Sequence, residues 1–101
     1  MNDGELLRSY SEAGDERAFR DLVERHSGMV YSTALRRMSE AHAAADVTQA
    51  VFCLLLRKAG RLYGVPDLAP WLHRATCWKA SEQLRAERRR QFHEQAAARM
   101  N

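Results

Sequence analysis

The sequence predicts an all-α protein, a compact domain of four helices. Glycine and proline fall between segments of helical periodicity, and no segment shows the strict alternation of apolar and polar residues that half-buried strands need. The 101 residues suit one domain with one core, and 46% hydrophobic with 29% charged residues is typical of a folded soluble protein. Nothing resembles a signal peptide or a run of about eighteen apolar residues, so we expect a cytoplasmic protein.

Capping residues define the first two helices. The first is predicted over about residues 3–13, with Asp3 as its N-cap and Gly14 at its end. Asp15 is suited to cap the second helix, in which we expect a bend or a change of packing partner after Gly28. Its apolar stripes consist of Phe19, Leu22, Val23 and Val30, then of Tyr31, Leu35 and Met38.

The third and fourth helices are separated by a loop that contains glycine and proline. The third is predicted over about residues 43–62; its apolar centre also suits a buried strand, but Ala-rich flanks and total length favour a helix. The loop is expected over 63–69, and Pro70 suits the first turn of the fourth helix. That helix is expected to reach about residue 90, with a polar tail that extends it or begins a linker.

Arginine and tryptophan recur on one face of the fourth helix, which we call the arginine–tryptophan stripe. Its members follow one another at helical spacing of three or four residues. They are Trp71, Arg74, Trp78, Ser81, Arg85, and Arg88 or Arg89. Flat rings interleaved with guanidinium groups suit unstacked bases and phosphates. A solvated helix end, favoured by the helix dipole, is the alternative for the arginines, and a core position is the alternative for Trp71.

The charge distribution supports a polyanionic partner for the C-terminal third. Residues 1–70 hold nine Lys/Arg and ten Asp/Glu, whereas residues 71–101 hold seven and three, within a total net charge of +3.

The third helix carries a different surface, a small and polar face on an otherwise apolar helix. This face consists of Asp46, Gln49, Ala50, Cys53 and Arg57. It is either an ordinary solvated face or a site for a partner helix.

Three segments in this order resemble region 2 of bacterial RNA polymerase sigma factors of the extracytoplasmic-function type. They are Ala18–His26, Ala45–Phe52, and Trp71–Arg74 followed by Leu84–Arg90. The resemblance implies a region 2 domain over residues 1–95, with 96–101 as the start of a linker, and we expect the family's second DNA-binding domain to be absent from this chain. An anti-sigma partner is common in the family.

The resemblance assigns partners to both surfaces. It implies that the third helix binds the clamp coiled coil of the largest polymerase subunit through Asp46, Gln49, Ala50, Phe52, Cys53 and Arg57. It also implies that the loop receives a flipped-out base of the minus-ten promoter element, while the last helix holds the non-template strand. The implied DNA-binding residues are Tyr63, Asp67, Trp71, Arg74, Trp78, Arg85, Arg88 and Arg89. Ala50 and Trp78 depart from the glutamate and asparagine that are usual in the family.

Catalysis is not expected, and neither is a metal or cofactor. His73 and Cys77 are four residues apart, but two ligands do not make a zinc site. Phosphate-binding glycine loops and nucleophile motifs are missing, and two distant cysteines do not suggest a disulfide framework. A protein-binding helical module and a duplex-reading helix-turn-helix protein are the alternatives, although the loop is long for the latter.

Overall fold

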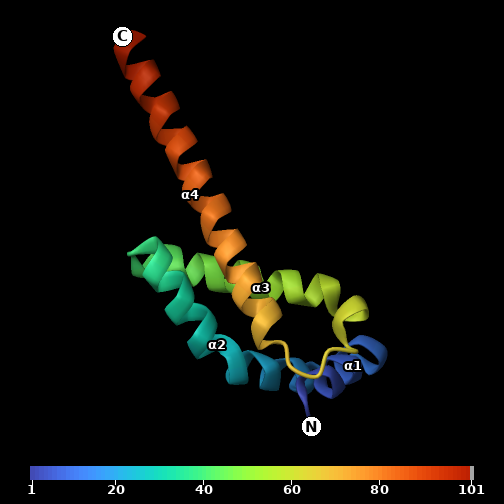
Figure 1. The fold of residues 1–101 in the computed structure, drawn as a ribbon. Helices are drawn as coiled ribbons and strands as arrows, with labels where there is room; N and C mark the ends of the chain where they lie inside the picture. Colours follow the sequence, from blue (N-terminus) through green and yellow to red (C-terminus); the bar gives the residue numbers. More distant parts are fainter. Residues whose placement is uncertain (101) are drawn as a thin grey trace.

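The computed structural model describes residues 1–100, which form four helices and no strand (Figure 1). The helices are α1 (Asp3–Ala13), α2 (Glu16–Met38), α3 (Ala41–Leu62) and α4 (Ala69–Met100). The predicted all-α architecture of four helices is therefore confirmed. Within the described residues, no helix is both long and apolar enough to cross a bilayer.

The core lies where α2 packs against α3 and the first half of α4, with α1 closing the end of the pair α2 and α3. Each helix contributes fully buried aliphatic side chains, which is why the amphipathic periodicity of the sequence predicts the packing. The largest on the helices are Leu7, Leu22, Val30, Val47, Val51, Leu55 and Leu72, and they are joined by Leu68 from the loop between α3 and α4. Helix α4 packs inward through its less polar face, on which Leu72, Thr76 and Ala80 are buried.

Helix α2 runs past Gly28 without interruption. Beyond this glycine the fully enclosed residues are Val30, Thr33 and Ala34, whereas Leu35 is 38% exposed. The stripe predicted for this part of the helix is therefore displaced by about one residue. A displacement of one residue turns a side chain by roughly 100° around the helix axis, and here it leaves Tyr31 at the edge of the core rather than inside it.

The N-cap of the first helix lies one residue earlier than predicted. Asn2 is the N-cap: its side chain accepts a hydrogen bond from the Glu5 N–H, and the Glu5 side chain accepts one from the Asn2 N–H. The prediction of Asp3 as N-cap is therefore wrong, and its carboxylate is used elsewhere. The predictions of Asp15 as N-cap of α2 and of Gly14, in the left-handed region at φ 67°, as the end of α1 are confirmed.

Helices α3 and α4 both extend beyond their predicted bounds. Glu40 caps α3 by accepting hydrogen bonds from the backbone of His42 and Ala43, so the helix begins at Ala41. Helix α4 continues to Met100 because strong helix formers fill residues 86–100, without glycine or proline. The segment expected to begin a linker is helical over 96–100, and Asn101 lies outside the described residues. The second half of α4 projects from the other helices (Figure 1).

Candidate functional site

Asp3 fastens the loop between α3 and α4 to the body of the protein. Its Oδ2 accepts hydrogen bonds from the Leu68 N–H at 2.8 Å and pairs with His26 Nε2 at 2.8 Å, while Oδ1 accepts one from Arg25 at 3.2 Å. The Asp3 N–H donates to the Pro66 carbonyl at 3.1 Å. We call this set of contacts the loop clamp. It joins three elements through one carboxylate that is only 5% exposed.

The pKa of Asp3 lies below its ordinary value of 3.8. Burial by itself raises this pKa, because it disfavours the charged form. The hydrogen bond from Leu68, the hydrogen bond and charge of His26, and the hydrogen bond from Arg25 together outweigh burial. The clamp therefore favours an ionised Asp3 over a protonated one.

Gly4 lets α1 approach the same loop closely. A Cβ atom at this position would lie 2.7 Å from the carbonyl oxygens of both Tyr63 and Val65, a distance that real Cβ atoms essentially never show. Both neighbours are backbone atoms, which cannot turn aside as a flexible side chain can. A side chain at residue 4 would therefore push the loop away from α1.

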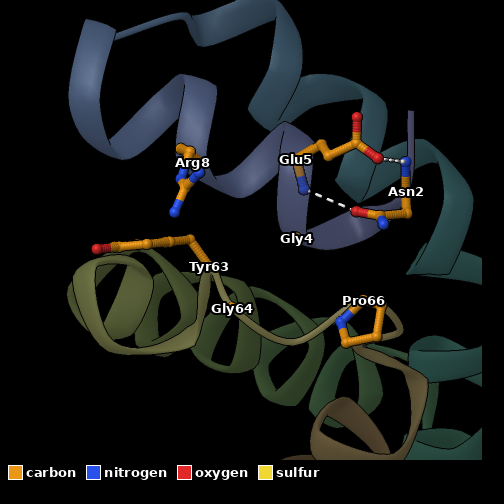
Figure 2. Close-up of a pocket in the computed structure, with 7 residues that line it drawn as sticks. All are labelled: Asn2, Gly4, Glu5, Arg8, Tyr63, Gly64 and Pro66. Carbon is orange, nitrogen blue, oxygen red and sulfur yellow. Dashed lines mark hydrogen bonds between the residues drawn. The ribbon is translucent and has the colours of Figure 1, made fainter.

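A pocket of about 280 Å³ opens between the first turns of α1 and this loop (Figure 2). Asn2, Gly4, Glu5 and Arg8 line it from α1, and Tyr63, Gly64 and Pro66 line it from the loop. The Arg8 guanidinium lies over the Tyr63 ring, 4.9 Å from its centroid. The polar side chains of Asn2 and Glu5 in its lining are already engaged as the capping box of α1.

The loop residues predicted to contact DNA differ in what they do. Tyr63 lines the pocket and is partly buried against α1. Asp67 is exposed, and its Oδ1 accepts a hydrogen bond from the Ala69 N–H at 3.0 Å, which helps to begin α4. Since Ala69 already belongs to the helix, the loop is one residue shorter than predicted.

Apart from its first residue, the arginine–tryptophan stripe lies on the face of α4 that points away from the core. Trp78 is 53% exposed, an unusual degree for a side chain of this size. Trp71 is partly buried and packs against the core, which agrees with the alternative considered for it. The four arginines that the sequence assigned to DNA, Arg74, Arg85, Arg88 and Arg89, are all exposed. The exposed part of the stripe therefore begins at Arg74.

A second surface is an apolar groove of about 390 Å³ between α2 and α3, which we call the α2–α3 groove. Helix α2 contributes Val23, Ser27 and Tyr31, and the α3 residues are Ala45, Thr48, Gln49, Phe52, Cys53 and Leu56. Three of the predicted polymerase-binding residues meet here, Gln49, Phe52 and Cys53. Phe52 is only 8% exposed, so it serves as the floor of the groove as well as part of the core.

The remaining residues predicted for this surface do not line the groove. Asp46 and Arg57 are exposed and stand next to the lining residues Ala45 and Leu56 in the sequence, and Ala50 is half-buried. The sequence pattern did not reveal that Tyr31 and Val23 of α2 form the opposite wall. The period of one helix shows which of its residues share a face, but not which neighbouring helix faces them.

His73 and Cys77 lie close together without forming a metal centre. Cys77 Sγ is 4.0 Å from His73 Nδ1, at the limit of a weak hydrogen bond. Nowhere in residues 1–100 do three or more His, Cys, Asp or Glu side chains gather in a way that could hold a metal ion. Both cysteines are free thiols.

Residues 22–90, more than half of the chain, match the family model of Sigma-70 region 2. The matched segment includes most of α2, all of α3, the loop and α4 as far as Arg90. No curated protein and no solved structure gives a significant match. Helix α1 and the last ten residues of α4 that the structure describes lie outside the matched segment.

Proposed function

The chain belongs to the Sigma-70 region 2 family, which recognises promoters and binds core RNA polymerase, and we propose that it is of the extracytoplasmic-function type and opens promoter DNA. In this proposal α3 and the α2–α3 groove bind the clamp coiled coil of the largest polymerase subunit. The loop and α4 hold unpaired bases of the non-template strand at the minus-ten element. The protein acts by binding, without a chemical step.

The observation that carries the proposal is the 53% exposed Trp78 ring between exposed arginines, on a helix that begins at a pocket-forming loop. Stacking on an aromatic side chain contributes about 1–3 kcal/mol per base, and arginines add phosphate attraction that weakens with salt. A base held in this way cannot pair with its partner strand. Tighter binding of single strand than of duplex therefore shifts the promoter toward its open state.

The sequence departs from the usual family pattern at two residues, and we expect binding at these residues to differ from that of typical family members. Tryptophan in place of asparagine at residue 78 replaces base-edge hydrogen bonding with stacking, because the indole has one donor and no acceptor. We therefore expect weaker base discrimination at the position bound by Trp78. Alanine at residue 50 removes a negative charge from the surface proposed to bind polymerase, which leaves the apolar groove as the main source of affinity.

Titration calorimetry with a clamp coiled-coil fragment tests the polymerase surface. We expect Gln49→Ala to weaken binding at least about fivefold, which corresponds to about 1 kcal/mol. Gln95→Ala, an exposed glutamine on the projecting part of α4, is the matched control and should bind as wild type. A folded protein that does not bind the fragment would contradict the polymerase assignment.

Fluorescence anisotropy with a single-stranded minus-ten oligonucleotide and its duplex tests the DNA surface. We expect preference for the single strand at low salt, and a loss of about 1–3 kcal/mol with Trp78→Ala. Leu35→Ala, which removes an exposed apolar side chain from α2, should have no effect. Preference for duplex would favour a helix-turn-helix protein. Absence of DNA binding at every salt concentration would favour a protein-binding module.

A further inference from the structure

The projecting part of α4 carries an exposed aromatic side chain that packing does not explain. Phe92 is 68% exposed, and the last buried residue of the helix is Ala80, three turns earlier. Its ring lies against the ring of the adjacent His93, with 5.8 Å between the centroids, and this stretch of α4 stands clear of the other helices in Figure 1. A single exposed phenylalanine is ordinary and does not by itself indicate a binding site. The position of Phe92 relative to the arginines of the stripe is the observation that indicates one.

Phe92 lies on the same face of α4 as Trp78. The two are fourteen residues apart with Arg85 halfway between them, and seven residues make about two turns of an α-helix. With Arg88 and Arg89 included, these side chains fall within an arc of roughly 100° around the axis. The arginine–tryptophan stripe, assigned from the sequence as far as Arg89, therefore continues for at least one more turn.

Charges on the projecting part of α4 are divided between its two sides. Glu87 and Glu94 lie more than roughly 130° around the axis from Phe92. Glu87 contacts Arg90, which also points away from the stripe. Arg99 follows Phe92 by seven residues and returns to the same face. The face that carries Phe92 is thus cationic and aromatic, without a carboxylate between Arg85 and Arg99.

On the basis of the proposed function, we propose that this face extends the single-stranded DNA surface and that Phe92 is a second stacking platform. The side chains that carry it are Phe92 with Arg85, Arg88, Arg89 and Arg99. At 1.5 Å per residue, Phe92 lies roughly 21 Å along the axis from Trp78. This distance corresponds to about six nucleotides at the 3.4 Å spacing of a stacked strand, and to fewer in an extended strand.

The length of the oligonucleotide separates the two platforms. A strand of three nucleotides is too short to reach from Trp78 to Phe92 even when it is extended, whereas one of fourteen can occupy both. We measure both oligonucleotides by fluorescence anisotropy at low salt with the whole chain. Phe92→Ala is expected to weaken binding of the longer strand about five- to tenfold and to bring its affinity close to that of the shorter one.

Matched variants test whether binding depends on the aromatic ring of Phe92. Phe92→Trp keeps an aromatic face and should bind as wild type or better, whereas Phe92→Leu keeps an apolar side chain and should behave as Phe92→Ala. Met100→Ala, another exposed apolar residue of the same helix, should have no effect. Because Phe92 contacts nothing in the core, circular dichroism is expected to show the same melting temperature for all these variants.

Failure of this inference differs from failure of the proposed function. If Trp78→Ala weakens both oligonucleotides but Phe92→Ala weakens neither, the stripe ends before Phe92 and the proposed function stands. If the wild type binds neither strand, the proposed function is contradicted as well. Sedimentation that shows self-association lost with Phe92→Ala would assign the ring to a second copy of the chain, and a larger loss for duplex than for single strand would assign it to duplex DNA. Either result overturns the inference.

Discussion

The loop clamp and the arginine–tryptophan stripe contrast in how their charged groups meet water. In the clamp, one buried carboxylate satisfies groups from α2 and the loop, so its partners lose their hydrogen bonds together if it is removed. In the stripe, each arginine is exposed and makes no packing contribution to the core. The clamp should therefore determine stability and loop position, whereas the stripe should determine binding with little effect on stability.

The largest effect is expected from Asp3→Ala. This change leaves the Leu68 N–H and the His26 ring without their partner in a buried place, which should reduce the free energy of unfolding by about 3 kcal/mol. Urea denaturation followed by circular dichroism measures it. Asp21→Ala, which removes an exposed carboxylate from α2, is the control and should change stability by less than about 0.5 kcal/mol. Similar values for the two variants would show that the clamp does not matter for stability.

Two glycine substitutions should change stability in opposite directions. Gly4→Ala places a methyl group against two carbonyl oxygens of the loop, and we expect a loss of about 1–3 kcal/mol from overpacking. Gly28→Ala, at an open position inside α2, should gain about 1 kcal/mol because alanine is the better helix former. Thermal unfolding of the two variants should show a lower melting temperature for Gly4→Ala and a higher one for Gly28→Ala. Equal shifts in melting temperature would mean that α1 does not press on the loop.

Most of the fold could be predicted from the sequence because helical periodicity and capping residues are local signals. Gly14 and Asp15 mark helix ends through their own chemistry, and both predictions are confirmed. The prediction of Asp3 as N-cap of α1 was wrong although a local signal was present, since Glu5 follows Asn2 at the spacing of a capping box and Leu6 follows Asp3 at that spacing. What the sequence does not show is the contact that the Asp3 carboxylate makes instead, with Leu68, 65 residues away.

The candidate site was predictable where it lies on one helix. The stripe on α4 follows from spacing alone, and the structure places Trp78 and its arginines at the surface. The pocket could not be predicted, because it joins the first turn of α1 to a loop sixty residues later. Glu5 and Arg8 have no unusual spacing that would single them out. A sequence shows which side chains share a helix face, but not which distant segment closes over them.

A smaller effect is expected from pH. Since the pKa of Asp3 in the folded protein is below 3.8, its contribution to stability is complete above that value and is lost as the pH falls through the folded pKa. Asp3→Asn cannot titrate, so its free energy of unfolding should fall less than that of wild type between about pH 5 and pH 3. Because wild type and Asp3→Asn have all other carboxylates in common, the difference between their pH profiles reports on Asp3 alone. Parallel pH profiles would contradict the lowered pKa.

The smallest effect on stability is expected from Arg85, Arg88 and Arg89, replaced together by alanine. The free energy of unfolding should change by less than about 1 kcal/mol, since exposed side chains contribute little. Binding of single-stranded DNA should nevertheless lose much of its salt dependence. Each phosphate contact adds about 0.7 to the slope of log K against log salt, so the loss of three contacts should reduce the slope by about 2. An unchanged slope with weaker binding would mean that these arginines stack on bases rather than pair with phosphates, and the stripe would then be a reading surface instead of an electrostatic one.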